Sequence, residues 1–302
     1  MIINAPINVS HFLKSRDSFA LVKDKKLTFN VLSENPRSLR FNRILTFLTI
    51  SAKEINDLKS NYNKIGLLQA FYRFLGFHSI DHNIFLLHGS ALIYNNKAVL
   101  FADNGHSTKK TLPSLELAFI SKEYIADEFL FLDLNSFEIF SDDNIPIHIR
   151  QEARNHFVQH HNINTTKEFL LKQSLRFKFI KRRKLDFIFY VNFSNNKEGI
   201  KKLPHRVAAK YAMITLSAHL KKMLNPSLDR FQFITQQDNN FVKDEKRNII
   251  IRRGIFKKVR LKLARASVKI ARSVLSFELF VQNPCNIRKY IDTIIGENIT
   301  SD

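Results

Sequence analysis

The sequence predicts a mixed α/β protein with an α+β extension at its N-terminus. Two observations lead to this prediction. Apolar runs of strand length alternate with amphipathic runs of helix length along most of the chain. Hydrophobic residues make up 44% of the 302 residues, which is enough to bury a large core.

The predicted extension covers residues 1–82. Two alternating segments, Lys26–Glu34 and Arg43–Ile50, predict strands, and residues 51–77 predict one or two helices. The pattern changes at Ile84, so residues 83–302 are predicted to form a second, larger domain.

The larger domain begins with two apolar runs, residues 84–94 and 97–102, that predict strands of a β-hairpin. Asn95 and Asn96 lie between them, and asparagine tolerates the left-handed backbone of a tight turn. The same pattern predicts a second hairpin that turns at Asn135-Ser136.

Later segments show the same two patterns, the alternation typical of strands and the amphipathic period typical of helices. Further strands are predicted at residues 123–127, 183–194 and 273–283. Helices are predicted at residues 111–119, 205–224 and 284–295, with Pro284 in the first turn of the last one. Residues 150–180 and 226–265 show neither period clearly.

The net charge of +21 is concentrated in two places. Residues 243–272 hold 12 Lys or Arg against 2 Asp or Glu, and the run Lys178–Lys184 holds five basic residues. Two interpretations stay open: a solvated basic surface, or a surface that binds nucleic acid, acidic lipid or an acidic protein partner. The neighbouring Phe177, Phe179 and Phe256 could stack on bases or pack in the core.

Several features predict a cytoplasmic protein. No apolar stretch reaches about 18 residues, so no membrane span is expected. The first residues lack a basic region followed by an apolar run, which argues against a secretory signal. Cys285 is the single cysteine, so neither an internal disulfide nor a cysteine-based metal cluster is expected.

The loop before residue 111 partly matches the phosphate-binding consensus G-x-x-x-x-G-K-[ST]. Lys110 and Thr111 fit, whereas Asn104 and Lys109 stand where glycines belong. In such loops backbone N–H groups at a helix N-terminus hold phosphate, the lysine reaches the outer phosphates and the hydroxyl holds Mg²⁺. The nucleotide-binding candidates are therefore Asn104, Gly105, His106, Ser107, Thr108, Lys109, Lys110 and Thr111.

Three further residues are catalytic candidates. Asp127 and Glu128 end a predicted apolar strand, where carboxylates can hold Mg²⁺ or accept a proton from an attacking hydroxyl. A solvated acidic turn is the alternative for this pair. His88 lies beside an apolar run, where a structural histidine is the alternative to a catalytic one.

Together these pieces resemble the kinase domain of the HPr kinase family over about residues 84–297. The motifs that carry the resemblance are HGSA (88–91), AVLF (98–101), the loop at 104–111, IADE (125–128), LFLDLNSFEIF (130–140) and NIPIHIR (144–150). The resemblance implies a fold like the core of PEP carboxykinase, with a mixed sheet and flanking helices. Residues 1–82 do not resemble the N-terminal domain of that family.

The resemblance also implies an activity: ATP-dependent transfer of a phosphoryl group to a hydroxyl of a protein, peptide or small molecule. Lys110 would bind the β- and γ-phosphates of ATP, while Thr111, Asp127 and Glu128 would hold Mg²⁺. Asp127 would be the base for the acceptor hydroxyl, and His88 would line the same pocket. It further implies a homo-oligomer.

The sequence departs from the family at Ala102 and Lys109, where glycines are usual. Two alternatives to an active kinase therefore stay open. One is a catalytically inactive kinase-like module that binds a nucleotide or a partner. The other is a basic polyanion-binding protein that works through Lys178–Lys184 and residues 243–272.

Overall fold

The protein is described by a computed structural model. The described residues are 2–4, 28–32, 40–42, 47–51, 72–73, 76, 79–104, 110–141, 147–149, 151–161, 169–170, 175–193, 197–224 and 245–299. The chain divides into two compact units. The first comprises Met1–His82 and His219–Leu261, and the second comprises Asn83–Ala218 and Lys262–Asp302.

The first unit contains a four-stranded sheet with the strand order β1-β2-β4-β3. Its strands are β1 (Ile2–Asn4), β2 (Thr28–Leu32), β3 (Arg40–Asn42) and β4 (Phe47–Ser51). β1 and β4 both run parallel to β2, whereas β3 runs antiparallel to β4. The two strands predicted from alternation in this region are thus present as β2 and β4. Most of the helical segment predicted at 51–77 lies outside the described residues.

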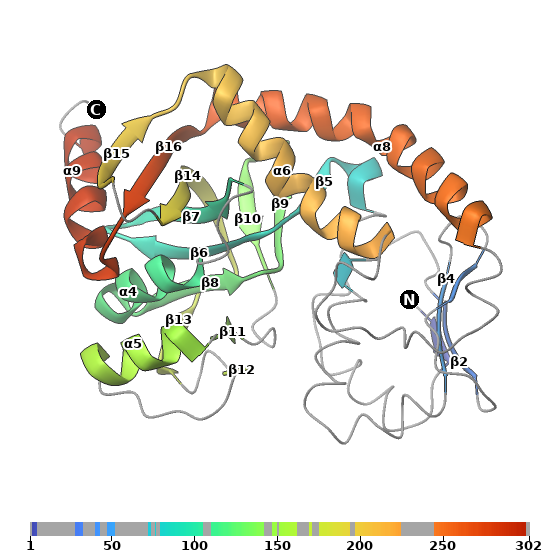
Figure 1. Ribbon diagram of the computed structural model, residues 1–302, viewed down its shortest axis with the longest axis horizontal. Helices are drawn as coiled ribbons and strands as arrows, with labels where there is room; N and C mark the ends of the chain where they lie inside the picture. The colour runs from blue at the N-terminus through green and yellow to red at the C-terminus, as the bar shows by residue number, and fades with distance from the viewer. Residues whose placement is uncertain are drawn as a thin grey trace. The chain divides into compact units, whose positions relative to one another are not determined.

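The second unit is built on a ten-stranded mixed sheet with helices on both faces (Figure 1). The main path is β13-β8-β6-β7-β14-β10-β9-β5, and β16 pairs with β14 and with β15. The first strands are β5 (Ile84–Leu87), β6 (Gly89–Tyr94), β7 (Lys97–Asp103), β8 (Glu123–Asp127), β9 (Leu130–Asp133) and β10 (Glu138–Phe140). The later ones are β13 (Lys178–Phe179), β14 (Arg182–Phe193), β15 (Gly199–Lys202) and β16 (Leu275–Val281).

The helices of this unit connect and cover the strands. They include α4 (Thr111–Ser121), α5 (Gln151–His161) and α9 (Ile287–Ile299), the last preceded by the 3₁₀ turn η6 (Pro284–Asn286). α6 (His205–Leu224) and α8 (Glu245–Ser273) each begin in one compact unit and end in the other. The fold is therefore mixed α/β with a mixed sheet and flanking helices, as the sequence predicts. No helix among the described residues combines the length and the apolar character that crossing a membrane requires.

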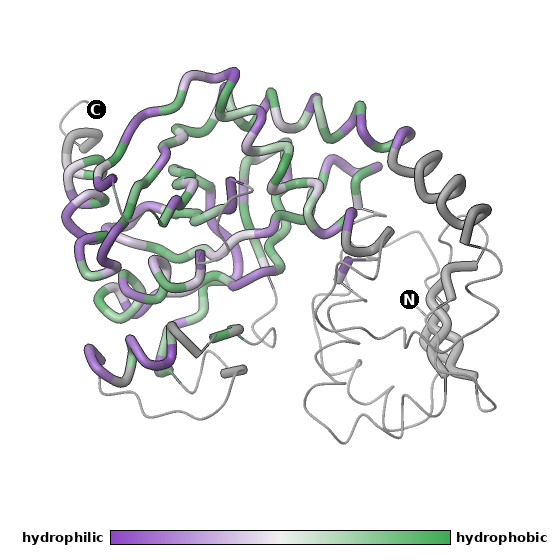
Figure 2. The backbone as a smooth tube through the Cα atoms, in the orientation of Figure 1, coloured by the Kyte–Doolittle hydropathy of each residue, from purple (hydrophilic) through white to green (hydrophobic). Residues whose placement is uncertain are grey.

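Alternate residues of the central strands face opposite layers of helices, because successive side chains of a strand point to opposite sides. Phe101 and Phe189 belong to a core cluster that includes residues of α4, α5 and α9. Tyr190, on the other face, contacts Tyr211 of α6 with ring centroids 5.1 Å apart. Figure 2 shows hydrophobic residues along these strands, in contrast to the mainly hydrophilic α5.

Two predicted hairpins are confirmed. Asn95 and Asn96 both have positive φ and join β6 to β7, and a four-residue turn, residues 134–137, joins β9 to β10. One prediction needs correction. The run 84–94 is not a single strand, because it breaks at His88 into β5, which pairs with β9, and β6, which pairs with β7 and β8. After β10, a short strand, β11 (Ile147–His148), pairs with β12 (Phe169–Leu170).

Candidate functional site

The strand directions bring the ends of three strands to one edge of the sheet. β6 runs antiparallel to β7 on one side and to β8 on the other. The start of β6 therefore lies beside the carboxyl ends of β7 and β8, with Gly89 opposite Ala102 and Ser90 opposite Asp127. α4 connects β7 to β8 by crossing β6, so its N-terminus lies at this same edge. Ligands of open α/β sheets bind at such carboxyl edges.

Gly89 allows the close approach of β6 to β7 at this edge. A Cβ atom at this position would lie 2.5 Å from Leu100 Cδ1 and 3.0 Å from the carbonyl oxygen of Phe101. Leu100 is fully buried, so its side chain has little room to move. The carbonyl of Gly89 also accepts a hydrogen bond from the backbone N–H of Glu128, at 2.7 Å. Glycine at this position thus fixes where His88 and Glu128 lie.

Lys110, His88 and Glu128 form a chain of contacts. The Nζ of Lys110 lies 3.0 Å from Nε2 of His88, and that same nitrogen lies 3.7 Å from Oε1 of Glu128. Lys110 is only 7% exposed and His88 9% exposed. When the ammonium donates to Nε2, the histidine is neutral and carries its proton on Nδ1. The geometry therefore holds a lysine cation beside an imidazole and a carboxylate at the edge of the sheet.

Glu128 adopts an uncommon backbone conformation. Its φ is +67°, in the left-handed region, which is unfavourable for a residue that has a Cβ atom. Such conformations persist when surrounding contacts hold them, and they cluster at functional sites. Here the backbone bond to Gly89 holds the turn, and the turn directs the carboxylate of Glu128 toward His88.

Thr111 and Asp127 form the second pair of the site. The hydroxyl of Thr111 donates to Oδ1 of Asp127 at 3.0 Å, and the side chain of Asp127 is almost fully buried. Thr111 is the first residue of α4, and a helix N-terminus favours negative charge nearby. A hydroxyl and a carboxylate side by side are hard oxygen ligands of the kind that Mg²⁺ prefers.

A buried hydroxyl network lies beneath these pairs. The Oγ of Ser90 lies 2.5 Å from Oγ of Ser114 and 2.6 Å from the hydroxyl of Tyr124. Ser114 in turn donates to the carbonyl of Thr111 at 2.9 Å. Burial, and after it the charge of Asp127, raises the pKa of Tyr124 far above its usual range, so the phenol keeps its proton. The network ties β6, α4 and β8 together under the site, and sequence analysis missed all three of its residues.

The structure describes six of the predicted site residues and brings five of them together. His88, Lys110, Thr111, Asp127 and Glu128 lie together at one edge of the sheet. Asn104 is buried just after β7, where Thr215 of α6 donates to the carbonyl of the preceding Asp103 at 3.4 Å. The rest of the predicted phosphate loop, residues 105–109, lies outside the described residues.

Two residues of the exposed basic run Lys178–Lys184 form ion pairs with acids of nearby strands. Arg182 pairs with Glu138 at 2.7 Å and with Asp133 at 3.3 Å, and Lys178 pairs with Glu123 at 2.7 Å. Phe177, a candidate for stacking on bases, is a core residue whose ring stacks on Tyr124 with centroids 5.6 Å apart. These contacts favour a structural interpretation of this run.

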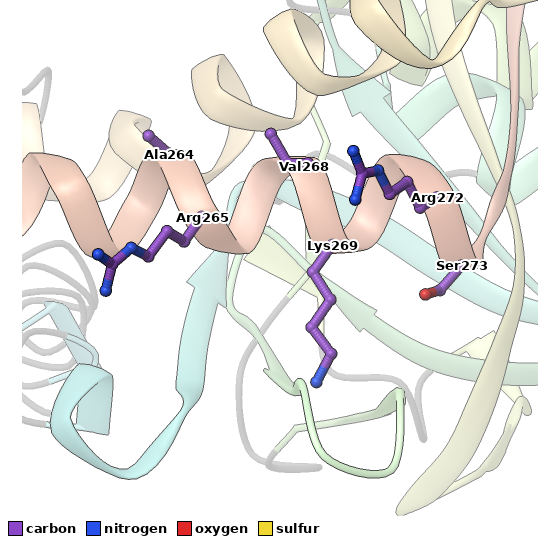
Figure 3. A pocket seen from close by; sticks show the side chains of 6 residues that line it. All are labelled: Ala264, Arg265, Val268, Lys269, Arg272 and Ser273. Atoms are coloured by element: carbon purple, nitrogen blue, oxygen red, sulfur yellow. The ribbon is translucent and has the colours of Figure 1, made fainter.

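The basic residues of α8 present a different surface. Within the second unit, a groove of about 490 Å³ is lined by Ala264, Arg265, Val268, Lys269, Arg272 and Ser273 (Figure 3). Lys269 donates to the carbonyl of Leu134 at 2.7 Å, and its ammonium lies 5.3 Å from the ring centroid of Phe137. The ammonium of Lys269 is therefore held against the turn between β9 and β10.

Comparison of the sequence with protein-family models and with curated proteins finds no match in either case.

Proposed function

We propose that the edge of the sheet formed by His88, Lys110, Thr111, Asp127 and Glu128 binds the phosphates of a nucleotide and transfers one to a hydroxyl. One observation carries the proposal. Residues from three separate segments, each expected from a phosphate-transfer motif, lie within hydrogen-bond distance in two adjoining pairs. A lone lysine or carboxylate would not support it, because surface charges are common.

The residues suit the groups they would hold. Lys110 supplies a buried cation for phosphate oxygens, and its ammonium contacts His88, which lies beside Glu128. Thr111 and Asp127 supply oxygen ligands for Mg²⁺. A bound Mg-nucleotide would supply the transferable phosphoryl group and neutralise charge on it. The carboxylates of Asp127 and Glu128 are the available proton acceptors for an incoming hydroxyl.

The topology supports a relationship to the HPr kinase and PEP carboxykinase fold as part of the same proposal. β7 leads through the loop into α4, and α4 leads into β8 across the antiparallel β6. This arrangement places the loop and the acidic strand end at one edge, as phosphoryl transfer on such a fold requires.

The alternative is a module that binds nucleotide without turning it over. It rests on Asn104 and Lys109, which stand where phosphate loops have glycine. A bulky residue at a position that needs positive φ would weaken the backbone cradle while leaving Lys110 and Thr111 in place. Nucleotide binding without phosphoryl transfer would be its signature.

Turnover of ATP distinguishes these possibilities. We expect slow ATP hydrolysis or phosphoryl transfer that requires Mg²⁺ and falls at least about 100-fold in Lys110→Ala and in Asp127→Asn, the scale of losing one electrostatic contact to the transition state. Lys289→Ala removes an exposed lysine from α9 and is the matched control, with unchanged turnover. Circular dichroism checks that each variant is folded. Equal turnover in Lys110→Ala and wild type would remove the assignment of the site.

A further inference from the structure

A second cluster of chemically active side chains lies apart from this site. α5 contributes His156, His160 and His161, α4 contributes Glu116, and η6 contributes Cys285. These segments are distant in sequence, so the cluster is a product of the fold. Residues 156 and 160 are four apart and therefore lie on the same face of α5.

Glu116 holds two of the imidazoles in place. Its Oε1 lies 2.6 Å from Nε2 of His156 and 2.9 Å from Nε2 of His161. The side chains of Glu116 and His156 are only 13% and 12% exposed. The ring of His161 also stacks on Phe119, with centroids 4.3 Å apart. The cluster is thus ordered by hydrogen bonds and packing.

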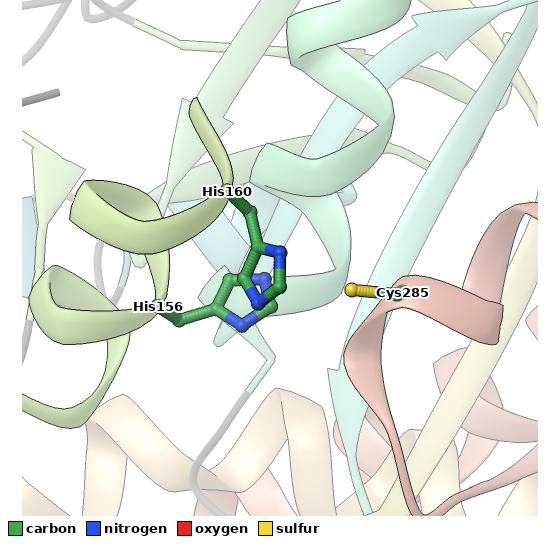
Figure 4. A group of neighbouring side chains, drawn as sticks. All are labelled: His156, His160 and Cys285. Carbon is green, nitrogen blue, oxygen red and sulfur yellow. The ribbon is translucent and has the colours of Figure 1, made fainter. Parts of the chain in front are cut away.

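Hydrogen bonds to Glu116 do not account for the other two members. The rings of His156 and His160 lie with centroids 4.5 Å apart, and Figure 4 shows the sulfur of Cys285 directed toward both. One ligand atom from each of His156, His160 and Cys285 lies within 4.8 Å of the others. Donors around a tetrahedral zinc lie roughly 3.5 Å apart, because the bonds are about 2.0–2.3 Å long. Side-chain movements of about 1 Å would close the set around one ion.

We propose that α5 and η6 bind a zinc ion through His156, His160 and Cys285, and that Glu116 orients His156. Two imidazoles and one thiolate are donors of the softness that selects zinc over Mg²⁺ or Ca²⁺. An imidazole that ligates a metal commonly gives its other nitrogen to a carboxylate, which is the contact that His156 makes with Glu116.

Binding would change the state of the thiol. Cys285 is an exposed free cysteine, and a free cysteine is mostly a thiol near neutral pH. The ion would displace that proton, as metals do when they bind cysteine. The ion would link η6 to α5 through these ligands. The sequence of α5 alone did not predict a helix.

Zinc binding to the untagged full-length protein tests the proposal by equilibrium dialysis and elemental analysis. We expect about one zinc per chain, with affinity about 10–100-fold weaker in Glu116→Gln and a larger loss in His160→Ala and Cys285→Ala. His82→Ala removes an exposed histidine outside the cluster and should bind as wild type does.

Co²⁺ gives a second readout, because the absorption of the wild-type complex reports directly whether a thiolate is bound to the metal. Co²⁺ bound to wild type should show a thiolate-to-metal charge-transfer absorption that Cys285→Ala abolishes. Absence of this absorption, no bound zinc in the wild type, or equal zinc binding in wild type, His160→Ala and Cys285→Ala would each overturn the proposal.

Discussion

Gly89 shows how much of the site depends on one residue without a side chain. A Cβ atom there would lie 2.5 Å from Leu100 Cδ1 and 3.0 Å from the carbonyl oxygen of Phe101, both in the core. We expect Gly89→Ala to lower the free energy of unfolding by about 1–3 kcal/mol, the usual effect of overpacking. Urea unfolding measures it.

Gly296→Ala is the matched control for this prediction. It adds the same methyl group within α9, where no atom beyond the neighbouring residues and the helix's own backbone lies within 4 Å of the added carbon. Alanine favours helix over glycine by about 1 kcal/mol, so this variant should be as stable as wild type or more stable. Similar losses of unfolding free energy in both variants would mean that the close packing around Gly89 does not cause the destabilisation.

A hydrogen bond between β6 and α9 makes the free energy of unfolding depend on pH in the alkaline range. Tyr94 of β6 donates to Oδ1 of Asp292 in α9 at 2.7 Å. Burial, followed by this hydrogen bond and the charge of Asp292, raises the pKa of Tyr94 to about 12. An unfolded tyrosine titrates near pH 10. The stabilising contribution is therefore complete below about pH 10 and is lost as the pH rises from about 10 to 12.

Replacing Tyr94 with phenylalanine isolates this contribution. Between about pH 9 and about pH 11, the free energy of unfolding should fall less in Tyr94→Phe than in wild type, because the variant has no proton to lose there. Urea unfolding at both values checks it. Parallel pH dependence in the two proteins would contradict the role of the Tyr94–Asp292 contact.

At the scale of elements, the sequence predicted the turns and strands that are determined by neighbouring residues. The asparagine turn at Asn95-Asn96 and the fully buried strands β6 and β7 were predictable, since turn residues and apolar runs are local signals. α5 was not, because Ala153, Phe157 and Val158 are the apolar residues among its eleven. The break between β5 and β6 was also missed. It reflects pairing with different strands, and the N–H of His88 there donates to the carbonyl of Thr215 on α6.

The same division applies to the site. His88, Lys110, Thr111, Asp127 and Glu128 were candidates because their residue types and flanking patterns suit phosphate chemistry. Their supporting residues, Ser90, Ser114 and Tyr124, were not found, because hydroxyls in apolar segments carry no pattern. Only the pairing of β6 with β8 and its packing against α4 brings those hydroxyls together.

At the scale of the whole molecule, a net charge of +21 supports the binding of anions in general. In the run Lys178–Lys184, Lys178 and Arg182 pair with acids of nearby strands, and their side chains remain 71% and 48% exposed. Lys110 is a buried cation, and the adjacent Thr111 and Asp127 supply oxygen ligands suited to Mg²⁺. The central claim is therefore that this edge, and not basic charge alone, binds a nucleotide.

Thermal unfolding with and without Mg-ATP, in wild type and Lys110→Ala, tests that claim most directly. A ligand at about 100 times its Kd stabilises by roughly 2.7 kcal/mol, which raises Tm by several degrees. We predict this rise in wild type and in Lys289→Ala, and its loss in Lys110→Ala. No rise in wild type, or an equal rise in Lys110→Ala, would contradict nucleotide binding at this edge.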